Sequence, residues 1–368
     1  MSRNSAVELM RIFACLIVVG VHTCLSAVSD GDIDIGRQFI ACLLADGVAV
    51  FWLIMGFFVF RNQDYRKLLV HTLKGIGIPM VVLSFFAFYF GPCIMEGRPI
   101  RTGFIHSADE YAEVLKKLIS WSNPVNGIGH LWYLYVYIMV ISIFPCLKCF
   151  TDYLDEDSRR IKIFLIASVS FFVLNDISDN ALASFSHHSI NALIPASIEV
   201  IWGHFLYRYR KLFQKKKYII LSMFAFVGAN LVRTLIQMSR YDLPDNNNCI
   251  LYWYSSIGLF CAISITVFCF SAIDQKNSFL NRMICRIASY TFLIYLLHPI
   301  IRNALRTHGF QDWLYELIFR WNDSFMADVL YTILILLSVF LVSFLISYIL
   351  KMVKKSVESI IGNIKKSA

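Results

Sequence analysis

Charged residues are scarce in this sequence. Only 16% of its 368 residues are Asp, Glu, Lys or Arg, whereas 58% are hydrophobic, and a soluble domain usually carries about 25% charged residues. No polar stretch is long enough to fold as a separate soluble domain. The composition therefore argues against a soluble enzyme and indicates a chain that lies in a membrane.

The residue pattern of a metal site is also missing. The ten cysteines are scattered along the chain, and Cys146-x-x-Cys149 is the one pair with that spacing. A zinc site of this kind needs a second pair of ligands, which the sequence does not have nearby. We therefore expect no metal ion and interpret most cysteines as small packing residues.

Long apolar blocks separated by short charged segments are present instead, the pattern of a polytopic helical membrane protein. We predict an all-α membrane domain over residues 1–355, followed by a basic cytoplasmic tail over residues 356–368. About ten transmembrane spans are expected, at residues 7–27, 37–60, 76–95, 131–150, 161–174, 190–207, 218–238, 250–273, 284–304 and 326–353.

The net charge of +9 comes from 34 Lys and Arg against 25 Asp and Glu. Most of the basic residues fall at one end of the predicted spans, as the positive-inside rule requires. This distribution predicts that both termini are cytoplasmic. It accounts for the charge by topology and by contact with anionic membrane lipids, so we expect no nucleic acid as a partner.

The apolar run from Glu8 to His22 is the most informative part of the chain, because it also contains Arg11. Eleven residues make three helical turns plus about 20°, so Arg11 and His22 share one face, about 16 Å apart along the axis. Ionisable groups inside a span are costly and usually functional. Glu8 can hold Arg11 in an ion pair, and the imidazole of His22 can accept a proton near neutral pH.

Four segments, in the expected order, resemble acyltransferase family three, whose members are integral-membrane O-acyltransferases that modify bacterial surface glycans. They are Glu8-x-x-Arg11-x10-His22, residues 45–58, His130-Leu131-Trp132-Tyr133-Leu134 and residues 289–299. Together they cover nearly the whole chain. One departure is Met55, which stands where the family usually has a serine.

The resemblance implies an O-acetyltransferase that takes acetyl-CoA as acyl donor and a cell-surface polysaccharide or lipid-linked sugar as acceptor. It implies that His22 is the general base, with a covalent acetyl-histidine route as the mechanistic alternative. Near the cytoplasmic end of its span, Arg11 is expected to bind a CoA phosphate or to polarise the thioester carbonyl, with Glu8 as its ion-pair partner. A basic group at the inner mouth is expected to bind the phosphates of CoA, namely Arg66, Lys67 and Lys74.

Four residues near the outer ends of the spans are candidates for binding the acceptor sugar: Asp46, His130, Trp132 and His298. Aromatic faces can stack on the CH surfaces of a sugar. His130 and Trp132 also fit an interfacial belt, and His298 fits a partner that orients His22. The sequence leaves these alternatives open.

A transporter or flippase of a lipid-linked glycan is the alternative function, because such proteins also combine many spans with intramembrane charges. Against it, the sequence shows no repeated halves.

Three structural expectations complete the sequence-based interpretation. Glu199 and Arg233 pair across neighbouring helices, because two isolated charges in lipid would be costly. Pro299 ends or kinks its span. Residues 109–121 form a short interfacial helix.

Overall fold

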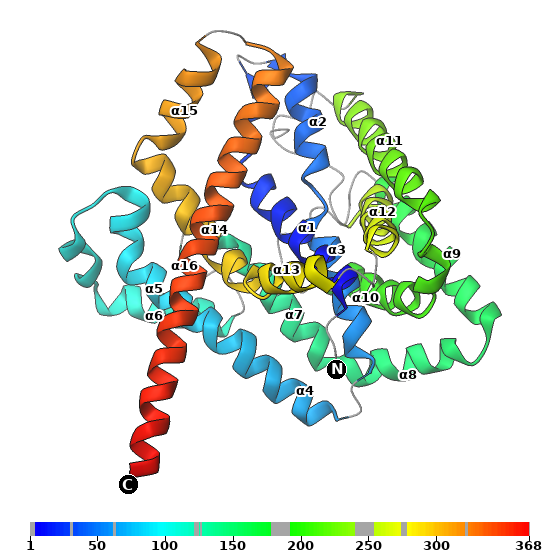
Figure 1. Ribbon diagram of the computed structural model, residues 1–368, viewed down its shortest axis with the longest axis horizontal. Coiled ribbons are helices and arrows are strands. Elements are labelled where there is room, and N and C mark those ends of the chain that lie inside the picture. The colour runs from blue at the N-terminus through cyan, green and yellow to red at the C-terminus, as the bar shows by residue number, and fades with distance from the viewer. Residues whose placement is uncertain are drawn as a thin grey trace.

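Helices form almost all of the regular structure in the computed structural model (Figure 1). Two short strands, β1 (Val28–Ser29) and β2 (Asp32–Ile33), pair antiparallel in the segment after the first helix. The expected all-α architecture is therefore confirmed. The structure describes residues 4–29, 32–61, 64–120, 125, 127–177, 192–239, 254–273, 278–320 and 323–367.

The α-helices, in chain order, are α1 (Ser5–Val21), α2 (Ile35–Leu43), α3 (Gly47–Val59), α4 (Tyr65–Thr72), α5 (Ile78–Glu96), α6 (Ala108–Ile119), α7 (Trp132–Ser142), α8 (Phe144–Asp155), α9 (Ser158–Ile177), α10 (Leu193–Arg208), α11 (Lys217–Ser239), α12 (Ser256–Ala272), α13 (Ser278–Ala288), α14 (Thr291–Thr307), α15 (Phe310–Phe319) and α16 (Phe325–Ser367). A π-helical turn, η1 (Leu73–Gly77), joins α4 to α5, and three 3-10 turns are η2 (Ile100–Phe104), η3 (Gly129–Leu131) and η4 (Arg210–Phe213).

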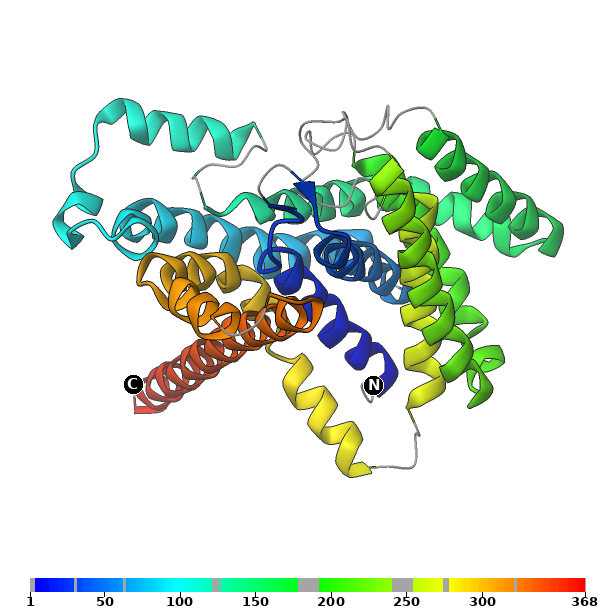
Figure 2. The ribbon, with the colours of Figure 1, turned by 90° about the horizontal axis from the view of Figure 1, so that it is seen from above.

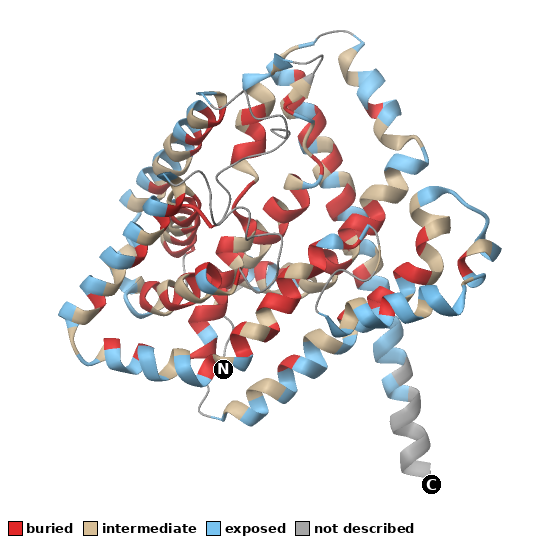
Figure 3. Cartoon of the chain, turned by 180° about the vertical axis from the view of Figure 1, so that it is seen from behind, coloured by how far each residue is buried: buried red, intermediate tan, exposed pale blue. Residues whose placement is uncertain are grey.

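Helix α1 lies inside the bundle and contacts α3, α12, α13, α14 and α16 (Figure 2). Buried residues gather toward the centre of the molecule, whereas the outer helices carry the exposed ones (Figure 3). The C-terminal part of α16 extends away from the bundle (Figure 1). The apolar helix that carries the Arg11 to His22 pattern is thus surrounded by other helices.

Helices at the periphery expose large apolar side chains, including Ile163 on α9, Phe224 and Leu235 on α11, and Leu341 on α16. Such extended apolar surfaces are not stable in water and fit contact with lipid. Among the described residues, four helices are long and apolar enough to cross a membrane, or up to six if each bent pair forms one span. The expected number of ten spans stays a prediction.

Two of the predicted spans are broken helices. The span predicted at 131–150 bends by 64° between α7 and α8, where Pro145 occupies the first turn of α8 and has no N–H to continue the preceding helix. The span predicted at 284–304 bends by 50° between α13 and α14. Helix α14 continues through Pro299 to Thr307, so of the two expected effects of this proline the end of the helix is wrong, and a kink at Pro299 stays a prediction.

The short helix expected at residues 109–121 is present as α6. Its first turn is closed by a capping box, in which Ser107 and Glu110 each accept a hydrogen bond from the other residue's backbone N–H. This arrangement satisfies two N–H groups that a helix start would otherwise leave without partners.

Helices α3 and α10 approach so closely that two positions admit only glycine. A Cβ atom on Gly56 would lie 1.9 Å from the carbonyl oxygen of Val200, and one on Gly203 would lie 2.1 Å from that of Leu53. The atoms in the way belong to the backbone, so no side-chain movement can make room. Gly56, in the segment 45–58 that resembles the family, is therefore required by the packing of α3 against α10.

We predict that Gly56→Ala separates α3 from α10 and lowers the free energy of unfolding by about 1–3 kcal/mol or more. Gly228→Ala is the matched control, because a Cβ at this position of α11 meets no atom within 4 Å. Melting of detergent-solubilised protein, followed by size-exclusion chromatography, measures the effect. Equal melting temperatures for the two variants would contradict the close contact.

Candidate active site

The N-terminal half of α1 holds a carboxylate and a guanidinium together. The Asn4 side chain caps the helix by accepting a hydrogen bond from the backbone N–H of Ala6. One turn later, Glu8 is buried and lies 3.3 Å from the Arg11 guanidinium, whose side chain keeps 32% of its surface exposed. Because its charge is balanced by Glu8, Arg11 can remain in an apolar bundle while one side of it stays open.

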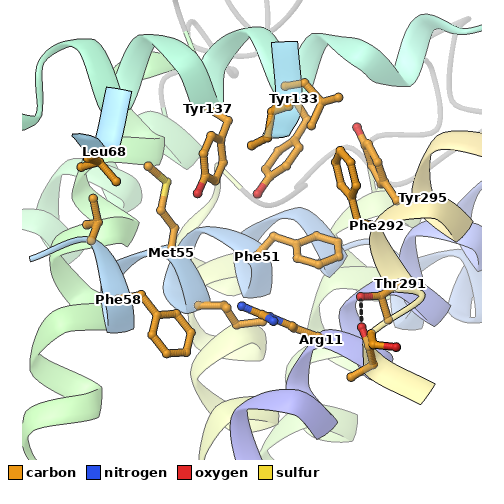
Figure 4. A pocket seen from close by; sticks show the side chains of 16 residues that line it. Arg11, Phe51, Met55, Phe58, Leu68, Tyr133, Tyr137, Thr291, Phe292 and Tyr295 are labelled. Atoms are coloured by element: carbon orange, nitrogen blue, oxygen red, sulfur yellow. Dashed lines mark hydrogen bonds between the residues drawn. The ribbon is translucent and has the colours of Figure 1, made fainter. Parts of the chain in front are cut away.

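Arg11 lines a cavity of about 410 Å³ (Figure 4). Its walls come from α1, α3, α7, the end of α13, α14 and the α4–α5 segment, and Arg11 is the one charged residue among the described lining residues. The hydroxyl-bearing lining residues are Tyr133, Tyr137, Ser289, Thr291 and Tyr295. Met55 also lines the cavity, so the position at which the family has a serine contributes an apolar thioether here. The cavity suits a mostly apolar ligand with an anionic or carbonyl group near Arg11.

Three histidines from distant parts of the chain meet beyond this cavity. The rings of His22 and His298 have centroids 5.4 Å apart, and those of His130 and His298 lie 5.1 Å apart. His298 is completely buried and His130 nearly so, whereas His22, which caps the end of α1, is exposed. Of the three imidazoles, His22 is therefore the one that a ligand can reach from outside the bundle.

The helix geometry around Pro299 fixes the tautomer of His298. Proline has no N–H, so the carbonyl four residues earlier, at Tyr295, loses its usual helical donor. The ring nitrogen Nδ1 of His298 lies 2.7 Å from that carbonyl oxygen. A carbonyl only accepts, so Nδ1 carries the hydrogen and Nε2 keeps its lone pair. Nε2 is buried and has no hydrogen-bond partner among the described residues, which makes it available to a neighbouring N–H, O–H or water.

Tyr295 connects the cavity to the histidines. Its side chain lines the cavity, and its hydroxyl donates a hydrogen bond of 2.5 Å to the backbone carbonyl of His130. The Tyr295 ring also lies 5.2 Å from the His130 ring and 6.0 Å from the His298 ring. The cavity and the histidine cluster thus share one wall. The sequence interpretation missed Tyr295, although its position three residues before His298 places both on one helix face.

The predicted pairing of Glu199 with Arg233 is wrong. Arg233 instead forms a completely buried ion pair with Asp46, at 2.9 Å, and donates to the Cys42 carbonyl and to Asn230. The Glu199 carboxylate oxygens are buried and have no hydrogen-bond partner among the described residues. The reason is spatial, since α11 packs against α2, which brings Arg233 beside the loop that ends at Asp46. The Asp46 carboxylate is thus already paired with Arg233. A role of Asp46 in binding the acceptor stays a prediction.

The remaining candidates lie around the cavity or beside the histidines. Arg66, Lys67 and Lys74 are exposed, on the same segment as the cavity-lining residues Leu68 and Ile76, and Lys67 forms an exposed ion pair with Asp64. Trp132 begins α7, two residues after His130, and lies edge-on to Tyr133. The basic residues therefore stand next to the cavity and outside its lining.

The family model described as "Acyltransferase domain", that of acyltransferase family three, matches residues 4–351. The chain belongs to this family. Searches of curated proteins and of solved structures returned no match. Since the family consists of polytopic membrane acyltransferases, the protein is a membrane-bound acyltransferase, and the cavity and histidines are its candidate active site.

We predict that Pro299→Ala releases His298 from its fixed tautomer, because the new backbone N–H competes for the Tyr295 carbonyl. Activity should fall on the order of tenfold, as when the group that orients a histidine is lost. Nitrogen-15 NMR of labelled histidine measures the tautomer directly. Pro92→Ala is the matched control, since this proline also lies inside a helix, α5, but follows Gly91. An unchanged His298 tautomer in Pro299→Ala would contradict the assignment.

We also predict that Asp46→Ala lowers the free energy of unfolding by about 3–5 kcal/mol, because it leaves Arg233 charged and buried. The double variant Asp46→Leu/Arg233→Leu should recover much of this loss. Lys148→Ala is the control, since its pair with Asp152 lies at the surface and such pairs contribute about 0–1 kcal/mol. Thermal melting in detergent checks all three. Equal melting temperatures for the single and the double variant would contradict the predicted cost of leaving Arg233 buried without its partner.

Proposed function

We propose that the protein is an acetyl-CoA-dependent O-acetyltransferase of the bacterial cytoplasmic membrane, which modifies a cell-surface polysaccharide or lipid-linked sugar. One observation carries the proposal: the cavity that Arg11 lines is also lined by Tyr295, whose ring contacts the histidine cluster that includes the exposed His22. A donor and an acceptor can therefore approach the same imidazoles from opposite sides.

Acetyl-CoA enters from the Arg11 end in this proposal. The cavity volume of about 410 Å³ is within the range of small-molecule sites and leaves room for the acetyl-pantetheine part. The nucleotide and its phosphates stay outside, where Arg66, Lys67 and Lys74 lie exposed beside the cavity. Guanidinium and ammonium groups are the usual partners of phosphates.

The distance along α1 favours one of the two roles considered for Arg11. Arg11 and His22 are eleven residues apart, or about 16 Å of helix axis. The attacked carbonyl has to lie next to the hydroxyl that His22 deprotonates, which is beyond the reach of the Arg11 side chain. Arg11 is therefore assigned to the end of the pantetheine arm nearest the phosphates, and the extended arm spans the distance to the histidines.

His22 acts as general base. The acceptor oxygen forms a bond to the thioester carbon as His22 takes the hydroxyl proton, and the carbon–sulfur bond then breaks as CoA leaves with a proton. In this mechanism, Nε2 of His298 accepts a hydrogen bond from one ring nitrogen of His22 when substrate is bound, and the other nitrogen of His22 then faces the hydroxyl. General-base catalysis of this kind contributes about 10²–10⁴-fold to the rate.

We predict that His22→Ala abolishes acetyl transfer while the protein still inserts and folds, because the residue caps α1 at an exposed position. His308→Ala is the matched control, since it removes an exposed histidine from the C-terminal cap of α14 and should keep full activity. NMR of the purified surface polysaccharide from complemented deletion strains measures the acetyl groups. Full O-acetylation with His22→Ala would refute the base assignment, and an untranslocated glycan in the deletion strain would favour a flippase.

A further inference from the structure

Helix α14 carries a second feature on its histidine-bearing face. Arg302 follows His298 by four residues, one helical turn, and so lies on the same face. It is half-buried. Its guanidinium donates a hydrogen bond to Asn303 at 3.4 Å, and no described carboxylate forms an ion pair with it. By contrast, Arg11, Arg37 and Arg233 each pair with a carboxylate.

The position of Arg302 is fixed by the contacts of its helix. The neighbouring Asn303 side chain contacts the sulfur of Met95, and the Thr307 hydroxyl donates to the Met95 carbonyl at 2.7 Å. Helix α14 is therefore attached to the end of α5 over the turn that follows Arg302. A guanidinium that is held in place loses little conformational entropy when it binds a ligand.

The charge of Arg302 reaches the exposed end of α1. Its guanidinium lies within electrostatic range of His22 and Cys24, which agrees with the 5.4 Å separation of the His22 and His298 ring centroids one turn away. Arg302 thus lies beside the exposed imidazole, on the side of the histidines opposite the cavity, because Thr291, Tyr295, His298 and Arg302 follow one another along α14.

We propose that Arg302 binds an anionic group, a carboxylate or a phosphate, that the acceptor glycan carries close to the hydroxyl to be acylated. This inference rests on the proposed function, since it assigns the acceptor to the exposed side of His22. The guanidinium presents parallel N–H donors that match either anion in a bidentate geometry. Arg306, one turn further and exposed, adds a like charge whose repulsion an anionic ligand relieves. The acceptor is accordingly an acidic or phosphorylated sugar.

Saturation-transfer NMR on the full chain in lipid nanodiscs tests this without relying on catalysis. The probes are methyl β-glucuronide for the carboxylate, glucose 6-phosphate for the phosphate, and methyl β-glucoside as the neutral reference, each with excess CoA to fill the donor side. We expect at least one anionic probe to bind the wild type about tenfold or more tightly than the glucoside, because hydrogen bonds to charged groups are the strong ones. The anionic probe that binds shows whether a carboxylate or a phosphate of the acceptor contacts Arg302.

Arg302→Gln should remove this preference and leave glucoside binding unchanged. Arg101→Gln is the control, since it removes an arginine from the exposed turn η2, far along the chain from α14, and should bind like the wild type. If Arg302→Gln fails to fold, two measurements replace it. One is the binding of the three probes to Arg302→Lys, and the other is the loss of the wild type's preference for anionic probes at high salt. A wild type that does not distinguish anionic from neutral probes, or an Arg302→Gln variant that keeps the preference or loses all three probes equally, overturns the proposal. Failure of acetyl transfer itself would appear only in the activity assay.

Discussion

Polar groups that this chain takes into an apolar helical bundle must find their partners inside it, because lipid offers none. The structure meets this constraint at three places. Arg233 reaches Asp46 across 187 residues of sequence, Arg11 is balanced by Glu8 within one turn, and the carbonyl that Pro299 leaves free is taken by the His298 ring. The first pair joins α11 to the start of α3, and the other two fix the orientation of the side chains at the candidate site.

The same constraint gives meaning to the polar atoms that the described residues leave without partners. Both ring nitrogens of His130 and Nε2 of His298 are buried in this state, within 5.1 Å between ring centroids. A buried polar atom without a partner costs about 1–3 kcal/mol, so the cluster gains stability from any group that fills these positions. Such a cluster is stable when water or a ligand completes it, and it lies where the proposed reaction requires acceptors for protons.

The sequence predicted the elements of the site better than their partners. The Arg11 to His22 spacing placed one residue at the cavity and the other beside His298, since both are set by the helix repeat along α1. The pairing of Arg233 failed because helix periodicity does not say which helices become neighbours, and a completely buried Asp46 looks the same in sequence as one at the mouth of a span. The break at Pro145 and the continuous helix at Pro299 differ for a related reason. A proline is tolerated inside a helix where another group, here an imidazole, satisfies the released carbonyl.

The register between α1 and α14 decides whether the histidines meet. Cys15 donates to the carbonyl of Thr291 at 3.6 Å, and seven residues further along each helix His22 lies beside His298. Because the two contacts are separated by seven residues on each helix, α1 and α14 run parallel and keep the same register over this stretch. Seven residues are nearly two helical turns, the interval of a heptad repeat. Thr291 belongs to the cavity wall, so the contact that aligns the histidines also aligns the cavity with them. A one-turn shift of α14, about 5.4 Å, would keep a cavity wall but part His298 from His22. The donor route and the proton acceptor are therefore set by one helix–helix register.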